Sequence, residues 1–340
     1  MRFNIGRCLL LAFFSSSFIL ASGMAYSAKV EIRIGHVEAP GQPIDVVLNN
    51  VAKRIEESSN GNISFRVFPG AQLGGARDMT EAVQMGFQQA TVIPAAFLGG
   101  FNPLTAVLDI PYVLPADDMK ARELLASEFG KEVLSSFGDY GMKAVGFWPG
   151  GRKSFSMNGE LNSLADFAGK RFRIMDSKVL MAEVSALGAN PVSMPFSDVY
   201  MGLQTGGVDG QENPLDSIVR MKFHEVQDSV LLTEHGVVEN IVLFNEAFWD
   251  GLSQEDKEIV SAAFSEGVSE LTALKKEAGE KALITLKEAG VKVNSPDEAM
   301  KVELKDKLFS AGYAEFIGMT GSKGEKLMEK YFSFVGENNQ

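Results

Sequence analysis

The 340-residue sequence contains one cysteine and three histidines, which limits the chemistry that it can perform. Cys8 lies in an apolar N-terminal block, so the rest of the chain has no thiol for a disulfide, a nucleophile or a metal site. His36, His224 and His235 are far apart, and none has a second histidine at metal-ligand spacing. The sequence therefore predicts no metal site.

The short motifs of common enzymes are also missing. The sequence contains no GxSxG nucleophile turn, no HExxH zinc motif, no GxxxxGK[ST] phosphate loop and no GxGxxG dinucleotide fingerprint. Its paired glycines lack the lysine or the strand-to-helix context of a phosphate site, and they are typical of turns. We therefore predict a protein that is not an enzyme and binds no cofactor.

Positive charge is scarce, with 32 Lys and Arg against 44 Asp and Glu and a formal net charge of -12. A nucleic-acid partner is disfavoured, because binding a phosphate backbone requires a concentrated basic face. A composition that is 45% hydrophobic and 22% charged is typical of a globular protein, and the length suggests two domains. Beyond the N-terminal block, no segment is long and apolar enough for a transmembrane helix.

The N-terminal residues have the pattern of a secretory signal peptide. Arg2 and Arg7 precede an apolar block over 8–21, and small residues follow around 25–28. A membrane anchor is the alternative, but the block is shorter than the roughly 20 residues that a bilayer requires. We predict a signal peptide over residues 1–27, with cleavage after Ala28 nearly as plausible, and localisation in the periplasm.

Strand-like and helix-like segments alternate along the remaining chain, which predicts an α/β fold. The first series comprises strands at 30–34, 63–67, 90–93 and 142–147 and helices at 44–58, 78–85 and 119–137. The second series comprises strands at 154–157, 171–174, 190–193 and 208–211 and helices at 178–187 and 197–204. The glycine-rich residues 149–151 between the two series predict the end of a first lobe.

Residues 253–289 predict one unusually long helix. Ser253 begins a sequence that resembles a capping box, and apolar residues then recur at helical spacing without an internal proline. Such a helix would be about 55 Å long, well beyond a small domain of roughly 30 Å, so it must bridge two lobes or project into solvent. Gly267 and Gly279 leave the alternative that it is broken into shorter pieces.

Two short segments of the second series could hold an anion. The alternation in 171–174 places Arg173 near the carboxyl end of a strand, where ligands of α/β sheets bind and where a guanidinium can pair with a carboxylate. A solvated surface arginine is the alternative. Asn213 precedes Pro214 and is predicted as a helix N-cap, a position that also favours an anion.

A different class of function would use Asp209 and Glu212. Two carboxylates are the minimum for glycoside hydrolysis, so a secreted glycoside hydrolase is the alternative to a binding protein. The pair is weak evidence, because carboxylates three residues apart are common in a chain with 44 acidic residues.

Several longer segments resemble a known family. The motifs lie at 68–74, 108–112, 169–174, 194–200, 203–214 and 248–252. Together they are similar to the substrate-binding subunit of tripartite ATP-independent periplasmic (TRAP) transporters, of the dicarboxylate-binding (DctP) type. The resemblance extends over nearly the whole chain after the signal peptide.

The resemblance implies a two-lobed, Venus-flytrap periplasmic binding protein with a long helix across both lobes. We expect the first lobe to comprise 29–150 and 239–279, and the second 151–238 and 280–340. The family implies binding of a small organic acid through its carboxylate, such as a dicarboxylate or a sugar acid. It also implies delivery of that acid to the subunits of a TRAP membrane permease.

The resemblance also assigns roles to single residues. Arg173 matches the arginine that pairs with the ligand carboxylate, Arg152 matches a second ligand-facing arginine, and Asn213 matches an amide on the same carboxylate. Phe196 and His235 occupy positions where relatives have cleft-lining side chains, with core packing and a surface loop as their alternatives.

Trp148 and His36 are further candidates for the pocket lining, with a core or exposed position as the alternative for each. Relatives that bind sialic acid carry acidic residues where this chain has Gly75 and Pro94-Ala95. This difference in the first lobe favours a smaller or less hydroxylated acid.

Overall fold

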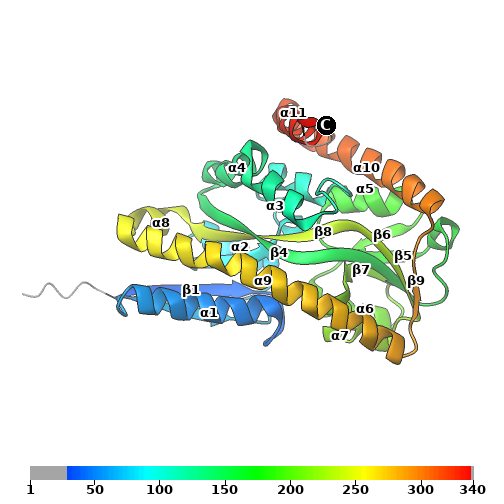
Figure 1. Ribbon diagram of the computed structural model, residues 1–340, viewed down its shortest axis with the longest axis horizontal. Helices are drawn as coiled ribbons and strands as arrows, with labels where there is room; N and C mark the ends of the chain where they lie inside the picture. The colour runs from blue at the N-terminus through cyan, green and yellow to red at the C-terminus, as the bar shows by residue number, and fades with distance from the viewer. Residues whose placement is uncertain (1–28, 338–340) are drawn as a thin grey trace, which may run out of the picture.

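The computed structural model describes residues 29–337, so the predicted signal peptide lies outside the described residues. Two long antiparallel strands, β4 (Met142–Met157) and β8 (Ser229–Asn245), lie at the centre of one nine-stranded sheet of order β2-β1-β3-β8-β4-β7-β5-β6, with β9 (Lys292–Asn294) paired to β8. Figure 1 shows both strands running along the length of the molecule. The predicted α/β class is confirmed.

The long central strands join two halves of the sheet. The first half consists of parallel strands β2 (Ile63–Phe68), β1 (Val30–His36) and β3 (Ala90–Pro94). The second half consists of β7 (Gly210–Pro214), β5 (Arg171–Ile174) and β6 (Asn190–Ser193), again parallel to one another. Parallel strands need crossover connections, and helices supply most of them in both halves.

The shorter helices cover the sheet and mostly agree with the expected ranges. They are α1 (Pro43–Ser58), α2 (Ala76–Gln84), α5 (Lys178–Ala186), α6 (Val199–Gln204), α7 (Leu215–Arg220) and α8 (Glu246–Gly251). Short 3₁₀ helices include η1 (Ala95–Phe97), η2 (Pro103–Asp109), η3 (Ser136–Tyr140), η4 (Leu164–Phe167), η5 (Phe196–Asp198) and η6 (Phe223–Glu225).

Several expected elements have other bounds in the structure, and the predicted end of the first lobe at 149–151 stays a prediction. The helix expected at 119–137 is divided into α3 (Asp118–Ala126) and α4 (Glu128–Ser135), because Ser127 is extended and its hydroxyl accepts the N–H of Phe129 at 3.2 Å. Strand β4 continues through 149–151, where its pairing with β8 shifts register instead of ending. A β-bulge lets a strand bend without losing its ladder, so the two halves share this strand.

The predicted long helix is confirmed as α9 (Gln254–Glu288), a single helix of 35 residues. Ser253 caps it by accepting the N–H of Asp256 at 3.0 Å. The helix packs against α1 of the first half and α7 of the second half, and Figure 1 shows it crossing the molecule diagonally. The alternative of a helix broken at Gly267 and Gly279 is therefore wrong.

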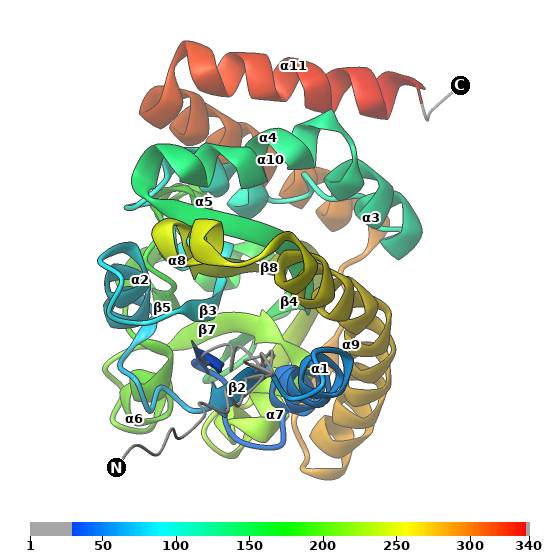
Figure 2. The same cartoon turned by 90° about the vertical axis from the view of Figure 1, so that its left-hand side faces the viewer.

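The chain ends in two further helices, α10 (Glu298–Thr320) and α11 (Ser322–Glu337). Helix α10 packs against α5, whereas α11 packs against α4 and α10, as Figure 2 shows. Leu327 and Met328 of α11 share a buried apolar cluster with Phe129 of α4. The C-terminal segment thus contacts helices of both series, and the assignment of 280–340 to the second lobe stays a prediction.

Within residues 29–337, no helix has the length and apolar character needed to cross a membrane.

Gly267 and Gly279 make a matched test of how closely α9 packs. A Cβ atom at Gly267 would lie 2.8 Å from the Trp148 ring and 3.2 Å from Val47 and Val51, whereas one at Gly279 meets nothing within 4 Å. We predict that Gly267→Ala lowers the free energy of unfolding by about 1–3 kcal/mol, since overpacking outweighs the helix preference of alanine. Gly279→Ala should raise it by about 0.5–1 kcal/mol. Urea unfolding of both variants tests this, and equal stabilities would contradict it.

Candidate functional site

A cavity of ≈ 670 Å³ opens between the two halves of the sheet. Its first wall includes Val37 after β1, Arg77 at the start of α2 and Phe97 of η1, and its second wall includes Asp176 and the segment 193–197. A smaller cavity continues it, because both share Val37, Phe97 and Phe196 in their linings, and it reaches Asn213 and Val238. We call the two together the cleft.

Arg173 lies directly behind the second wall of the cleft. Its side chain is buried, and its Nε and Nη2 atoms donate to the carbonyl oxygen of Met194 at 3.0 and 2.8 Å. Its guanidinium carbon is 5.9 Å from the centre of the Phe196 ring. Met194 and Phe196 both line the cleft, so the alternative of a solvated surface arginine is wrong.

The guanidinium of Arg173 retains one unused edge. Among residues 29–337, its buried Nη1 atom has no hydrogen-bond partner. Burial lowers the pKa of Arg173 to about 10, against an opposing effect of Glu212, so the side chain remains charged at neutral pH. Leaving a buried charged donor unpaired is costly, and an anionic oxygen placed at this edge would remove that cost.

Asn213 lines the inner end of the cleft but is not a helix N-cap. It pairs with Ser154 of β4 as part of β7, and α7 begins after Pro214, which takes the N-cap position without a side-chain hydrogen bond. The buried Asn213 amide donates to the side-chain oxygen of Gln211. The expectation failed because the strand continues further than its apolar pattern indicates.

Phe196 begins η5 and is half-buried beside Arg173. It packs edge-on against Phe223 with ring centres 6.0 Å apart, which fixes its orientation while one side faces the cleft. Arg173, Asn213 and Phe196 are therefore the expected residues that the structure brings together.

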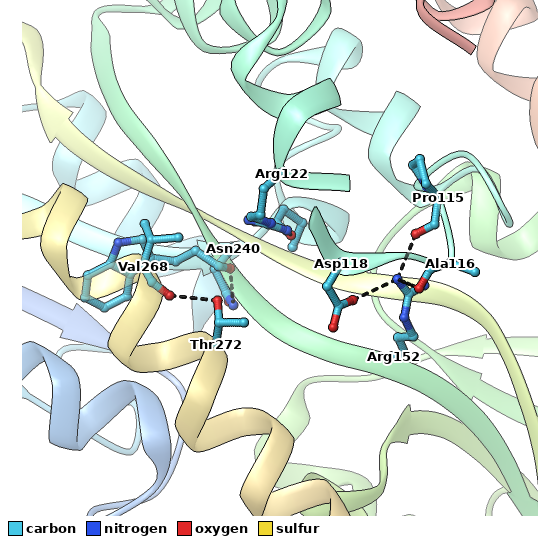
Figure 3. A network of polar contacts seen from close by, with 10 residues as sticks. Pro115, Ala116, Asp118, Arg122, Arg152, Asn240, Val268 and Thr272 are labelled. Atoms are coloured by element: carbon cyan, nitrogen blue, oxygen red, sulfur yellow. Dashed lines mark hydrogen bonds and ion pairs between the residues drawn. The ribbon is translucent and has the colours of Figure 1, made fainter. Parts of the chain in front are cut away.

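Arg152 points away from the cleft. Its Nη2 atom donates to the carbonyl oxygens of Pro115 and Ala116, both at 2.7 Å, and to Asp118 at 2.9 Å, as Figure 3 shows. Neighbouring side chains of a strand point to opposite faces. Here Lys153 points to the buried face, where its ammonium lies 2.7 Å from Glu212, so Arg152 points to the other face. The structure therefore does not bring Arg152 beside Arg173.

Trp148 and His36 are core residues, not part of the cleft lining. Trp148 is fully buried against α9, where its indole N–H donates to the carbonyl oxygen of Phe264 at 3.1 Å. His36 is buried with its Nε2 atom 3.4 Å from Asp45, and burial lowers its pKa although Asp45 opposes this effect. The core alternative therefore holds for both, and the pocket-lining interpretation is wrong.

His235 belongs to a buried charge cluster, which consists of Asp109, Lys153, Glu183, Glu212 and His235. The His235 Nε2 atom lies 2.9 Å from Glu183 and 2.8 Å from Glu212, and the Lys153 ammonium lies 2.7 Å from Glu212. The cluster joins β4, β7, β8, α5 and η2. His235 is thus neither a surface loop residue nor part of the cleft lining.

Electrostatics within the cluster favours the ionised pairs. Burial would lower the pKa values of Lys153 and His235, but Glu183 and Glu212 outweigh it and raise both. Burial would raise the pKa of Glu212, but Lys153 and His235 outweigh it and lower that value. Ligand atoms of Glu183, Glu212 and His235 lie within 4.8 Å of one another, as in a metal site, but the Lys153 ammonium already supplies a cation there.

The same contacts remove the basis for a glycoside hydrolase. Glu212 is buried between Lys153 and His235, whereas Asp209 pairs with Arg171 at 2.8 Å on a partly exposed surface. The two carboxylates do not face a common cavity, so they cannot act as an acid and a base on one substrate.

The sequence interpretation missed Asp109, Lys153 and Glu183. One signal was available for Glu183, which lies on the otherwise apolar buried face of α5 beside Val179, Leu180 and Val184. An acidic residue at helical spacing among buried apolar residues indicates a buried partner of opposite charge.

The cleft between the two halves of the sheet, with the buried Arg173 beside it, is the arrangement of a two-lobed receptor. Comparisons with known proteins agree with this class. Residues 34–316 match the family described as DctP, bacterial extracellular solute-binding protein, family 7. The chain belongs to this family, which confirms the resemblance seen in the sequence.

Curated relatives cover most of the chain. The C4-dicarboxylate-binding periplasmic protein DctP of Rhodobacter capsulatus is 36% identical over 270 residues, covering 78% of this chain and 80% of the relative. The sialic acid-binding periplasmic protein SiaP of Vibrio cholerae is 32% identical over 282 residues, covering 82% and 87%.

Solved structures of TRAP periplasmic solute-binding proteins have the same fold. One from Desulfovibrio salexigens with bound orotic acid is 42% identical with a TM-score of 0.89, covering 91% of this chain and 99% of that chain. Another from Sulfurospirillum deleyianum with bound succinate is 30% identical with a TM-score of 0.82, covering 89% and 98%.

Asp109 makes the stability of the protein depend on pH. Burial raises its pKa from 3.8 to about 7, although its hydrogen bond from Ser177 and the charge of Lys153 oppose this. The unfolded chain therefore releases this proton at lower pH than the folded protein, so stability falls as pH rises from about 4 to about 7. We predict that Asp109→Asn reduces the loss of unfolding free energy between pH 5 and 7.5 by ~2 kcal/mol.

Chemical unfolding at both pH values measures this difference. The control is Asp306→Asn on the exposed face of α10, which should leave the pH dependence of the wild type unchanged. Parallel pH dependences for wild type and Asp109→Asn would contradict the prediction.

Proposed function

We propose that this protein captures a small organic acid by its carboxylate and delivers it unchanged to a TRAP-type permease. The observation that carries the proposal is the buried Arg173 guanidinium, which lies behind the cleft wall with Nη1 unpaired among the described residues. Both curated relatives are periplasmic binding proteins by name, which supports export to the periplasm and removal of residues 1–27.

The hydrogen bonds of Arg173 determine which edge receives the acid. The Met194 carbonyl occupies the Nε and Nη2 edge, which leaves the edge formed by Nη1 and the second N–H of Nη2. A carboxylate can accept from both of these groups in parallel, and such planar pairs are stronger and more specific than a single hydrogen bond. The Asn213 amide, at the inner end of the cleft, is the candidate second contact.

The net charge of -12 does not oppose binding of an acid. Charges on the protein surface are screened within about 8 Å at physiological ionic strength, whereas the pair with Arg173 forms at contact distance in a buried site. The local attraction therefore dominates the interaction with a small anion.

Arg171 and Arg173 offer a matched pair of variants in one strand. Arg171 is partly exposed and bonded to Asp209, whereas Arg173 is buried beside the cleft. We predict that Arg173→Ala weakens acid binding about 100-fold, since a charge-assisted pair is lost. Arg173→Lys should weaken it less, because lysine keeps the charge but loses the planar edge.

Calorimetry with orotate and succinate as probe acids measures these effects, and a thermal melt of each variant shows that it folds. Arg171→Ala should bind like the wild type. Unchanged affinity in Arg173→Ala and Arg173→Lys, or an equal loss in Arg171→Ala, would contradict the proposed role of Arg173.

The walls of the cleft favour a flat ligand. Phe97 from the first half and Phe196 from the second half each line both parts of the cleft, and Val37, Met194 and Met221 add further apolar surface. A planar unsaturated ring can stack on aromatic walls, whereas a hydroxylated sugar acid would leave polar groups unpaired there. The similar structure with bound orotic acid supports this choice, so we propose a planar, unsaturated carboxylic acid.

A comparison of orotate with dihydroorotate tests whether the site requires a planar ligand. Both carry a carboxylate on a six-membered ring, but reduction of the ring double bond removes its planarity. We predict that wild type binds orotate at least about tenfold more tightly, and that Phe196→Leu reduces this ratio, because aromatic stacking contributes roughly 0.5–1.5 kcal/mol. Equal affinity for the two acids, or tighter binding of galacturonate, would contradict a planar ligand.

A further inference from the structure

A second cavity, of ≈ 470 Å³, shares no lining residue with the cleft. It lies where the connection 108–116 meets the central part of β8 and the helices α10 and α11. We call it the back cavity. Its volume is within the roughly 300–1,000 Å³ of small-molecule sites in proteins.

Positive charge gathers around the back cavity. Its charged lining comprises Lys120, Arg152, Lys301, Lys305 and the buried His235, which pairs with Glu183 and Glu212, and Glu234 is the one acidic lining residue. Arg152 pairs with Asp118 and Lys301 pairs with Glu298, whereas within residues 29–337 neither Lys120 nor Lys305 has an ion-pair partner. The whole chain has 44 acidic and 32 basic residues, so its net charge is negative, whereas the lining of the back cavity is locally positive and favours an anion.

Arg152 is held in position at the edge of the back cavity. Its hydrogen bonds to Pro115, Ala116 and Asp118 fix the guanidinium against the 108–116 connection, as Figure 3 shows. Only Nη2 makes these contacts, so they leave the other N–H groups of the guanidinium unused, and 19% of the side chain is exposed. A fixed cation loses less conformational entropy on binding than a free lysine does.

The inner surface of the back cavity is apolar. Leu108, Ile110, Val113 and Leu114 are nearly fully buried and line it together with the half-buried Val237. An apolar surface bordered by cations fits a ligand with one anionic head and an apolar body, because each part then leaves water for a matching environment.

The backbone around the back cavity has an unusual conformation. Lys153 pairs with Gly236 and Phe155 pairs with Leu231, so the four residues 232–235 of β8 lie opposite Ser154 alone. Glu234 in this bulge has φ +46° and Tyr112 has φ +62°, and both residues line the cavity. Left-handed conformations of such residues cost free energy and often occur at functional sites.

We propose that the back cavity is a second binding site, for an amphiphilic organic anion such as a medium-chain carboxylate. The anionic head lies among Lys120, Arg152, Lys301 and Lys305, and the apolar body lies on the Leu108–Leu114 surface. This site is independent of Arg173 and of the acid bound in the cleft.

Octanoate is the probe, and octanamide is its neutral counterpart of similar size. We expect octanoate to bind the wild type and Arg173→Ala with the same affinity by calorimetry, and octanamide to bind at least about tenfold more weakly. The combined variant Lys120→Gln, Lys301→Gln and Lys305→Gln should weaken octanoate binding about tenfold, while the affinity for orotate in the cleft stays that of the wild type.

A second combined variant controls for total charge. Lys53→Gln, Lys143→Gln and Lys170→Gln remove three exposed lysines that do not line the back cavity, and octanoate should bind this variant like the wild type. Loss of octanoate binding in Arg173→Ala would place octanoate in the cleft and overturn the proposal. Unchanged binding in the back-cavity variant, or equal binding of octanamide, would also overturn it.

Discussion

The guanidinium of Arg173 carries its charge inside the protein, with one edge bonded to the Met194 carbonyl and Nη1 unpaired among residues 29–337. Charge in such a place is unfavourable unless an anion can approach it. The fold provides that approach, because the segment 193–197, which begins at the last residue of β6, forms a wall of the cleft directly in front of this side chain. Membership in a family of extracellular solute-binding proteins fits this arrangement.

The buried charge cluster stabilises the strands beside this site. Lys153, Glu212 and His235 come from three neighbouring strands, and their ion pairs join β4, β7 and β8 at the level where the ladder between β4 and β8 is irregular. Removing one partner of a buried pair typically costs about 3–5 kcal/mol, because the remaining charge stays buried. The strands that carry Asn213 and the central bulge are therefore held in one register by polar contacts.

Local patterns in the sequence were sufficient for part of this structure. The spacing of apolar residues and a capping serine predicted α9, and the alternation in 171–174 placed Arg173 on a strand end. The direction of Arg152 and the core position of Trp148 could not be predicted, because they depend on partners at 115–118 and 264, far away in sequence. Lys153 was missed for the same reason, since its acidic partners lie on other elements.

A crystal structure of the protein with orotate would test the central claim most directly. The account predicts that the carboxylate accepts hydrogen bonds from the Nη1 and Nη2 atoms of Arg173 at about 2.7–2.9 Å, with the ring between Phe97 and Phe196. An orotate molecule whose carboxylate contacts neither nitrogen, with Nη1 still unpaired, would contradict it.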